Sequence, residues 1–342
     1  MKHFKKFIAI ICLSAMMVCC FSYSASALVL MDGYFGYELN TYTREATLAE
    51  YNGSETIVTI PGSYTTYPVT KLGGNALSGN STMQTLNIPT SMNKIDNRAL
   101  SKCTSLSSVR FPANITSLGE RVCLNCTSLQ TAYVYAAINT LPAYSFAGCS
   151  SLTTVDLNQS ITGIGNYAFL DCDSLSNVGF LSQISTIGKS AFDGTGITQL
   201  TIPESITSIP DYAFANCSAL VYAEIPESVT NISSCAFYND PNLTLGVWYD
   251  SYAHSYAESN NIPYVLLDQV KLGDTDSDGN VTINDVTTIQ RHIARLTTLE
   301  GIYLDAADIN RNGVVDISDA TEIQRFLADF PVIDPIGEAI SH

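Results

Sequence analysis

Two short acidic segments near the C-terminus, residues 274–285 and 308–319, hold the residue types best suited to binding a metal ion. Each places oxygen-bearing side chains at loop positions 1, 3, 5, 9 and 12, with glycine at position 6. Calcium takes six or more oxygen ligands, and a glycine lets the backbone wrap tightly around the ion. Position 7 adds its backbone carbonyl. The spacing therefore predicts two calcium ions, with these ligands: Asp274, Asp276, Asp278, Asn280, Thr282 and Asp285 in the first loop, and Asp308, Asn310, Asn312, Val314, Asp316 and Asp319 in the second.

A helix is expected after each loop, and it must hold the loop in place. Thr282 should cap the first helix together with Asp285, while Asp316 and Asp319 play these parts in the second. Apolar residues then recur at helical spacing: Ile283, Val286, Ile289, Ile293 and Leu296, and in the second copy Ile317, Ala320, Ile323, Leu327 and Phe330. The segment before Asp274 is too short and apolar for an entering helix. We therefore expect two units, each a loop plus an exit helix, packed together with pseudo-twofold symmetry.

Residues 273–330 resemble a type I dockerin, the module that attaches proteins to the cohesins of a cellulosome scaffold. The resemblance rests on G-D-x-D-x-D-G-x-V in the first copy, A-D-x-N-x-N-G-x-V in the second, and a late Gln-Arg pair in each helix. It implies a dual-mode cohesin-binding surface formed by Ile283, Asn284, Gln290 and Arg291 in one copy and by Ile317, Ser318, Gln324 and Arg325 in the other. The Ser-Thr pair common in some dockerins at loop positions 10 and 11 is absent, which leaves the choice of cohesin open.

A repeat fills the chain before this module, and its pattern returns at a fixed interval that shortens once by a single position. It aligns a column of large aliphatic residues: Leu72, Ile95, Leu118, Leu141, Ile164, Ile187, Ile209 and Ile232. An Ala-Phe slot, a cysteine column and a short strand follow in each repeat, as in Ala168, Phe169 and Cys172. Apolar columns in register predict a solenoid whose core is a stack of equivalent side chains.

The repeat resembles the BspA-like class of leucine-rich repeats over roughly residues 55–265, with the pattern I-x-x-x-A-F-x-x-C-x-x-L-x-x-V-x-I-P. A hairpin over residues 36–49 is expected to cap its start, and a helix within residues 248–257 its end, with Trp248 sealing the core. The fold class is thus mixed: a leucine-rich-repeat solenoid of short parallel strands plus turns, followed by a small all-α domain of paired calcium loops and helices.

Residues 1–27 read as a signal peptide, with Lys2, Lys5 and Lys6 before a short apolar run and a small-residue cleavage site. A membrane anchor is the alternative interpretation. The expected domains are therefore 1–27, a signal peptide; 28–267, the capped repeat domain; and 268–342, the dockerin with its tail. Loss of the leader leaves 13 basic and 32 acidic residues. Such a charge disfavours nucleic acid and anionic membranes as partners, and we expect a secreted protein associated with the cell surface through a scaffold.

Ten cysteines are present, three of them in the leader, and five of the others share one slot of the repeat. Secretion permits disulfides. A slot inside the stack nevertheless favours buried thiols that act as small apolar side chains. Outside the leader, Cys123 and Cys126, three residues apart, are the two cysteines closest in sequence.

No residue is expected to be catalytic. The histidines outside the leader are His254, His292 and His342, so the repeat array has no base for a serine or cysteine nucleophile. Glycoside hydrolysis needs two carboxylates. Glu204, Glu224 and Glu227 are near each other in the repeat array, but Glu204 and Glu227 occupy equivalent surface slots.

Binding surfaces remain. The outward-facing strand positions form a column, in which Arg110, Tyr133, Asp156, Tyr222 and Glu224 are the candidate ligand residues. A second column, of Tyr144, Tyr167 and Tyr212, either stacks on sugar rings or packs at a turn. The sequence thus predicts a secreted, non-catalytic cellulosome subunit whose dockerin binds a cohesin through calcium and whose solenoid binds a protein or a polysaccharide. The alternatives are a polysaccharide-degrading component, active in polysaccharide catabolism, and a surface adhesion or protease-binding protein.

Overall fold

The computed structural model describes residues 28–249, 251–267, 270–276, 278–299, 302–332 and 335–340. The predicted signal peptide, residues 1–27, lies outside the described residues. Within the described residues, none of the helices has the length and apolar character needed to cross a membrane.

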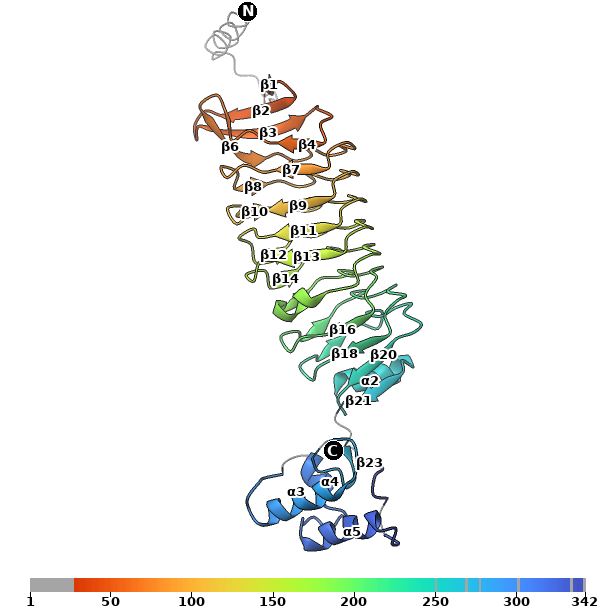
Figure 1. The fold of residues 1–342 in the computed structure, drawn as a ribbon. Coiled ribbons are helices and arrows are strands. Elements are labelled where there is room, and N and C mark those ends of the chain that lie inside the picture. Colours follow the sequence, from red (N-terminus) through yellow and green to blue (C-terminus); the bar gives the residue numbers. More distant parts are fainter. Residues whose placement is uncertain are drawn as a thin grey trace, which may run out of the picture.

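Residues 28–267 form a β-solenoid of about ten turns, stacked in chain order in Figure 1. An antiparallel cap of β1 (Leu30–Asp32), β2 (Phe35–Asn40) and β3 (Glu45–Tyr51) begins the stack. β3 then pairs in parallel with β6 (Tyr67–Leu72), which also forms a hairpin with β5 (Ser63–Tyr64). The antiparallel pairing of β2 with β3 confirms the hairpin expected at the start.

Two ladders of parallel strands run along the solenoid, one on each side of the core. The longer strands are β4 (Ile57–Thr59), β7 (Thr85–Asn87), β9 (Ser108–Phe111), β11 (Thr131–Val134), β13 (Thr154–Leu157), β16 (Gln199–Thr201), β18 (Tyr222–Glu224), β20 (Thr244–Val247) and β21 (Tyr264–Leu266). The second ladder starts at β6 and continues through two-residue strands: β8 (Lys94–Ile95), β10 (Ser117–Leu118), β12 (Thr140–Leu141), β14 (Gly163–Ile164), β15 (Thr186–Ile187), β17 (Ser208–Ile209) and β19 (Asn231–Ile232). Partners such as Tyr133 and Asp156 occupy the same position in consecutive repeats, so the register follows the sequence repeat.

The core between the ladders is a set of columns, as the repeat predicts. Phe146, Phe169, Phe192, Phe214 and Phe237 stack at successive ring distances of 5.7, 5.4, 5.4 and 5.6 Å. The thiols form a parallel column in which each sulfur donates to a carbonyl oxygen of the preceding turn, for example Cys126 to Leu100 at 3.1 Å. Six cysteines are buried and Cys235 is half-buried.

The longer ladder consists of three sheets: β4 with β7, then β9, β11 and β13, then β16, β18, β20 and β21. A 3₁₀ helix, η1 (Gly179–Gln183), takes the place of a strand between β13 and β16. The sheet of β9, β11 and β13 therefore ends there, and the third sheet begins at β16. Gly179 has the same place in its repeat as Asp156 and would therefore be expected in a strand, but the structure places it in η1.

Helix α2 (Tyr252–Asn260) closes the end of the solenoid. Ser251 caps it by accepting a hydrogen bond from the His254 amide, and Tyr256 packs against Phe237 at a ring distance of 6.4 Å. Trp248 is only half-buried and lies outside the core cluster, so the prediction that it seals the core is wrong.

A second hydrophobic cluster holds the C-terminal residues together. Its elements are β22 (Val270–Lys271), α3 (Ile283–Ile293), α4 (Ile302–Ala307), α5 (Ile317–Leu327) and β23 (Ala339–Ile340). Helices α3 and α5 pack against each other, and β22 pairs antiparallel with β23. The short helix α4 ends directly before Asp308, so the second unit has an entering helix that the sequence did not predict.

Candidate metal centre and interaction surfaces

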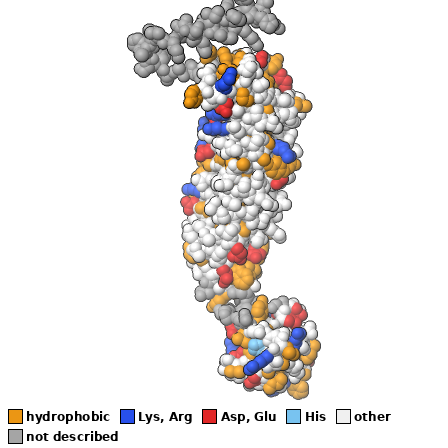
Figure 2. Space-filling model, turned by 90° about the vertical axis from the view of Figure 1, so that its left-hand side faces the viewer, with side chains coloured by type: hydrophobic (Ala, Val, Ile, Leu, Met, Phe, Trp, Pro, Cys, Tyr) orange, Lys and Arg blue, Asp and Glu red, His pale blue; other side chains and the backbone are white. Residues whose placement is uncertain are grey.

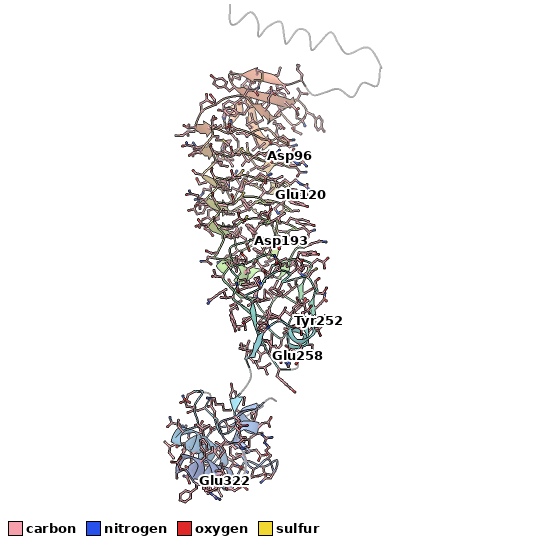
Figure 3. All side chains as sticks on the ribbon, turned by 90° about the vertical axis from the view of Figure 1, so that its right-hand side faces the viewer. Asp96, Glu120, Asp193, Tyr252, Glu258 and Glu322 are labelled. Atoms are coloured by element: carbon pink, nitrogen blue, oxygen red, sulfur yellow. The ribbon has the colours of Figure 1, made fainter. Side chains whose placement is uncertain are left out.

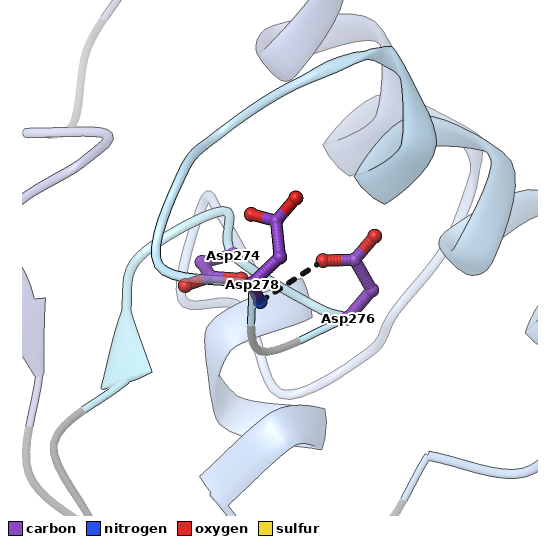
Figure 4. Close-up of side chains that lie close together, drawn as sticks. All are labelled: Asp274, Asp276 and Asp278. Carbon is purple, nitrogen blue, oxygen red and sulfur yellow. Dashed lines mark hydrogen bonds between the residues drawn. The ribbon is translucent and has the colours of Figure 1, made fainter.

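The first acidic loop brings three carboxylates together (Figure 4). One oxygen from each of Asp274, Asp276 and Asp278 lies within 4.8 Å of the other two. Asp274 is buried, whereas Asp276 and Asp278 are exposed. The backbone amide of Asp278 donates to Asp276 at 3.2 Å and fixes the curve of the loop. The cluster is all oxygen, which is the donor type that calcium prefers.

The position-12 carboxylates hold each loop closed onto its helix. Asp285 is fully buried, and its Oδ1 accepts from the amides of Thr275 at 2.7 Å and Asp276 at 3.2 Å. Its Oδ2 accepts from the Thr282 amide at 2.7 Å. In the second loop, the buried Asp319 accepts from the amides of Asn310 at 3.2 Å and Asp316 at 2.9 Å. The two loops therefore share one internal hydrogen-bond pattern.

Glycine at position 6 makes the turn in both loops. Gly279 has φ +83° and Gly313 has φ +84°, the left-handed region that side chains disfavour. Their amides donate to the position-1 carboxylates, Gly279 to Asp274 at 3.0 Å and Gly313 to Asp308 at 2.7 Å. The turn thus points the first carboxylate of each loop inward.

The clustered carboxylates shift the pKa values of individual aspartates in the loops. Partial desolvation raises the pKa of the Asp276 carboxyl above its ordinary value, and the carboxylates of Asp285 and Asp278 add to the rise. The Ser318 hydroxyl and amide hold the pKa of Asp316 below its usual range. A bound cation would relieve the repulsion among the carboxylates of the first loop.

Both helices begin as the sequence predicts. Thr282 and Asp285 form a complete capping box on α3, and Asp316 and Asp319 form one on α5. Of the predicted apolar stripes, only the central residues Val286, Ile289, Ala320 and Ile323 are buried. Both ends of each stripe face outward, which corrects the expectation that whole stripes pack together. The first residue of each stripe is exposed, Ile283 to 59% and Ile317 to 61%.

The residues that the sequence assigned to a partner are all exposed: Ile283, Asn284, Gln290, Arg291, Ile317, Ser318, Gln324 and Arg325. They occupy equivalent places on α3 and α5. Arg325 is partly engaged by its own chain, because it pairs with Glu322 at 3.3 Å and donates to the Pro331 carbonyl at 2.8 Å.

The candidate ligand residues of the solenoid fall on two sheets. Arg110, Tyr133 and Asp156 are direct neighbours on β9, β11 and β13. Tyr222 and Glu224 lie on β18, beyond the interruption at η1. The sequence predicted a single ligand face for these five residues, whereas the structure places them on two separate sheets.

Tyr135 belongs to the first of these groups, and the sequence interpretation missed it. Its ring centroid lies 4.7 Å from the guanidinium carbon of Arg110, and its hydroxyl hydrogen-bonds to Asp156. This hydrogen bond, with some desolvation, raises the pKa of Tyr135. The alternation Tyr133, Val134, Tyr135 was the available signal, because alternate strand residues share a face.

Residues 51–153 and 139–251 match the family model of the BspA type leucine rich repeat region, in six copies. Together these segments cover more than half of the chain. The chain belongs to the BspA-type leucine-rich repeat family.

The BspA-type solenoid is followed by a second matched module. Residues 272–328 match the dockerin type I domain, which confirms both resemblances and their order along the chain. Type I dockerins bind calcium and bind cohesins, and the cluster of Asp274, Asp276 and Asp278 lies within this module. Leucine-rich repeat solenoids mediate protein interactions, and neither type of module is catalytic. Proteins of both kinds are typically extracellular or associated with the cell surface.

Several solved structures are similar to the BspA-type solenoid. A leucine-rich repeat protein from Bacteroides ovatus is 20% identical, with a TM-score of 0.48, over 64% of this chain and 71% of that one. One from Eubacterium ventriosum is 26% identical, with a TM-score of 0.45, over 65% of this chain and 51% of that one. A leucine rich cell surface protein from Faecalibacterium prausnitzii is 21% identical, with a TM-score of 0.39, over 70% of this chain and 99% of that one. Comparison with the curated proteins gave no significant match.

Proposed function

We propose that this protein is a secreted, non-catalytic cellulosome-type subunit. Its dockerin module attaches it to a scaffoldin cohesin in a calcium-dependent way, and its solenoid binds a protein or polysaccharide ligand. The observation that carries the proposal is the duplicated loop and helix, in which each copy combines a set of oxygen donors with an exposed partner surface. Secretion rests on the leader of residues 1–27.

Two calcium ions are proposed, one in each loop. Asp274, Asp276, Asp278, Asn280, Thr282 and Asp285 would hold the first, and Asp308, Asn310, Asn312, Val314, Asp316 and Asp319 the second. Bound calcium would neutralise the clustered carboxylates and tie the start of each loop to its helix. The buried Asp285 and Asp319 already tie each loop to its helix through backbone amides.

The cohesin surface is proposed on the exposed residues of α3 and α5. Ile283 and Ile317 expose apolar side chains at position 10 of their loops, with the Gln-Arg pairs two helical turns further on. An exposed apolar centre with a polar, basic border is typical of interaction surfaces. Because the two copies are equivalent, a cohesin could bind with either copy leading.

Calorimetric titration of residues 28–342 with a panel of cohesins, with calcium and with a chelator, tests this proposal. We expect a one-to-one complex with a matching cohesin that forms only with calcium. Ile283→Lys or Ile317→Lys alone should leave binding largely intact, whereas the double variant should abolish it. Leu296→Lys, which alters a side chain 71% exposed outside this surface, is the matched control. Calcium uptake without binding to any cohesin would contradict the docking role.

A cell-surface adhesion role is the second candidate, because leucine-rich repeat solenoids mediate protein interactions. It predicts that the solenoid binds a host or microbial protein. A polysaccharide-degrading role predicts release of reducing sugar from wall polymers, and the absence of such release with intact cohesin binding would support the non-catalytic assignment.

A further inference from the structure

A hollow of about 620 Å³ opens on the side of the solenoid formed by the shorter strands. It spans three consecutive turns, from the end of β6 to the turn after β10. We name it the basic groove. Its charged and polar lining includes Lys71, Lys94, Asp96, Asn97, Arg98 and Arg121. It lies away from Arg110, Tyr133 and Asp156, which belong to the other ladder.

Positive charge is concentrated in this groove. Residues 28–267 contain eight lysines and arginines, and four of them line the basic groove, although the chain as a whole carries a net charge of −16. On the face shown in Figure 2, the Lys and Arg side chains of the solenoid gather over its N-terminal half. Such a concentration in an acidic protein indicates an anionic ligand.

The nearby acids do not cancel this charge. Asp96 serves two cations, Lys71 at 2.5 Å and Lys94 at 4.0 Å. Glu120 pairs with Arg121 at 3.2 Å. Arg98 makes no ion pair within the described residues. Asp96 and Glu120 follow one another along one edge of the solenoid in Figure 3, and each lies beside a cation of its own turn, Asp96 beside Lys94 and Glu120 beside Arg121.

The backbone holds the two arginines rigidly. Arg98 and Arg121 occupy the same place in consecutive turns, each with φ +58°. The Arg98 amide donates to the Glu120 carbonyl and the Arg121 amide to the Ala143 carbonyl, both at 2.9 Å. Their side chains therefore leave the backbone about one strand spacing apart, ~4.8 Å. The backbone that carries both arginines is thus already ordered before a ligand binds.

Aromatic rings continue the same column beyond the groove. The Arg121 guanidinium carbon lies 4.4 Å from the centroid of Tyr144, whose ring stacks on Tyr167 at 4.5 Å and 12°. Both rings are half-buried, so part of each remains open to solvent. The next residue of the column is the small, buried Ser190, so the pair of rings ends there. The planar rings of Tyr144 and Tyr167 lie beside the cation of Arg121. This arrangement suits a ligand that carries negative charges and also has flat ring faces that can stack on the tyrosines.

We propose that the basic groove, together with Tyr144 and Tyr167, binds a polysaccharide of uronic acids. The inference rests on the proposed role of the solenoid in ligand binding and names its ligand class. Arg98 and Arg121 would each bind a carboxylate through the planar fork of the guanidinium. Asp96, Asn97 and Glu120 would accept or donate hydrogen bonds to sugar hydroxyls. A polymer with one carboxylate and several hydroxyls per sugar matches a groove in which each of two consecutive turns holds both an arginine and an acid.

Other polyanions fit this surface less well. Nucleic acid and highly sulfated glycans carry dense charge, and Asp96 and Glu120 would repel it. An extended peptide would need a free strand edge, but β8 is paired on both sides, with β6 and with β10.

The test is calorimetric titration of residues 28–342 with an oligogalacturonate and with the same oligomer fully methyl-esterified. We expect binding of the acid form that weakens with salt, and little binding of the ester, which keeps the rings and loses the charge. The double variant Arg98→Asn and Arg121→Asn should weaken binding at least tenfold for each guanidinium lost. Asparagine suits this left-handed position, because Asn75 occupies it in the preceding turn at φ 61°. Arg44→Asn, which removes the same charge at an exposed left-handed position between β2 and β3, outside the groove, should leave binding unchanged.

Three outcomes would overturn the inference: no binding of the oligogalacturonate by the unmodified chain, equal binding of the ester, or tighter binding of polyglutamate or of a sulfated glycan. The titrations with the methyl ester and with added salt use the unmodified chain. They therefore test the inference even if the double variant misfolds. Cohesin binding is measured on the same sample. Its persistence without binding of the oligogalacturonate would reject this inference and leave the docking role standing.

Discussion

The cysteine column shows how a place in the repeat controls the chemistry of a side chain. Burial raises the pKa of Cys217 to about 12 and holds the pKa of Cys172 well above its ordinary value. Thiolate is the reactive form of cysteine, so buried thiols with raised pKa values react slowly. These sulfurs serve the core as small apolar groups that each donate one hydrogen bond.

We therefore predict that a thiol reagent labels only Cys235 in native residues 28–342 at pH 8. The other six cysteines are buried and should react only after the solenoid unfolds. Mass spectrometry before and after denaturation gives the count, and Cys235→Ala should remove the native reaction. Rapid labelling of a second cysteine, or fewer than seven free thiols after unfolding, would contradict the prediction.

Asp240 occupies the same slot as the cysteines, and it carries a buried carboxyl. Neither oxygen has a hydrogen-bond partner within the described residues. Burial raises its pKa to about 7, the backbone amide of Cys217 opposes the rise, and Asp193 adds to it. The folded chain therefore holds this proton more tightly than the unfolded chain, in which aspartate titrates near ~3.9.

The sign of the pH dependence follows from this difference. Between about pH 4 and 7 the folded state binds more protons at Asp240, so its contribution to stability is lost as pH rises through that range. We predict that the free energy of unfolding of Asp240→Asn rises relative to that of the unmodified chain as the pH is raised from 5 to 7.5. Denaturant unfolding at each pH measures this difference. Asp211→Asn is the control: the Ser233 hydroxyl holds the pKa of Asp211 below its usual value, so this carboxyl stays ionised across that pH range and its variant should show a difference that does not change with pH. An Asp240→Asn difference that does not change with pH would contradict this account.

At the scale of elements, each turn of the solenoid is stabilised by the turns beside it. The Phe192 ring contacts Phe169 and Phe214, both at 5.4 Å and nearly parallel. Neighbouring repeats supply most of the stability in such arrays, because a single turn cannot bury its own apolar face.

We predict that Phe192→Ala destabilises the solenoid by about 3–5 kcal/mol, because it opens a cavity in the middle of the stack. Equilibrium denaturation of residues 28–342 measures the change. Tyr42→Ala is the control: Tyr42 is 96% exposed, and its loss should cost less than about 0.5 kcal/mol. A cost below about 1 kcal/mol at Phe192 would mean that the stack collapses around the gap.

At the scale of the whole molecule, the two hydrophobic clusters differ in what holds them. The solenoid cluster is large and continuous from Tyr37 to Ala257. The C-terminal cluster is small, and 13 acidic residues lie between positions 271 and 342. We infer that self-repulsion in the loops makes the folding of that module depend on a cation.

We predict that a calcium chelator unfolds α3 and α5 while the solenoid stays folded. Circular dichroism at 222 nm should lose most of its helical signal, since α2 is the only α-helix of the solenoid within the described residues. Limited proteolysis should then cleave within residues 270–340 and spare the repeats. Asp285→Asn and Asp319→Asn should each reduce the calcium bound from two ions to one. Unchanged helicity with the chelator would reject calcium-dependent folding.

Much of this architecture is local and periodic, and the sequence therefore predicted it. A pattern that returns at a fixed interval forces equivalent side chains into columns, and this predicted the solenoid and its buried cysteines. The loop spacing and the residues three apart at each helix start predicted the carboxylate cluster and both capping boxes, because these contacts lie within a dozen residues of one another.

Only the tertiary structure decided features in which distant or non-repeating segments meet. The replacement of a strand by η1, the short helix α4, and the pairing of β22 with β23 have no periodic signal. The basic groove needed the fold as well, since Lys71 and Lys94 share one slot of the repeat and Arg98 and Arg121 share another, and only the stacking of three turns brings them into one hollow. Periodicity determines which residues share a column, whereas the packing of the turns determines which columns lie side by side.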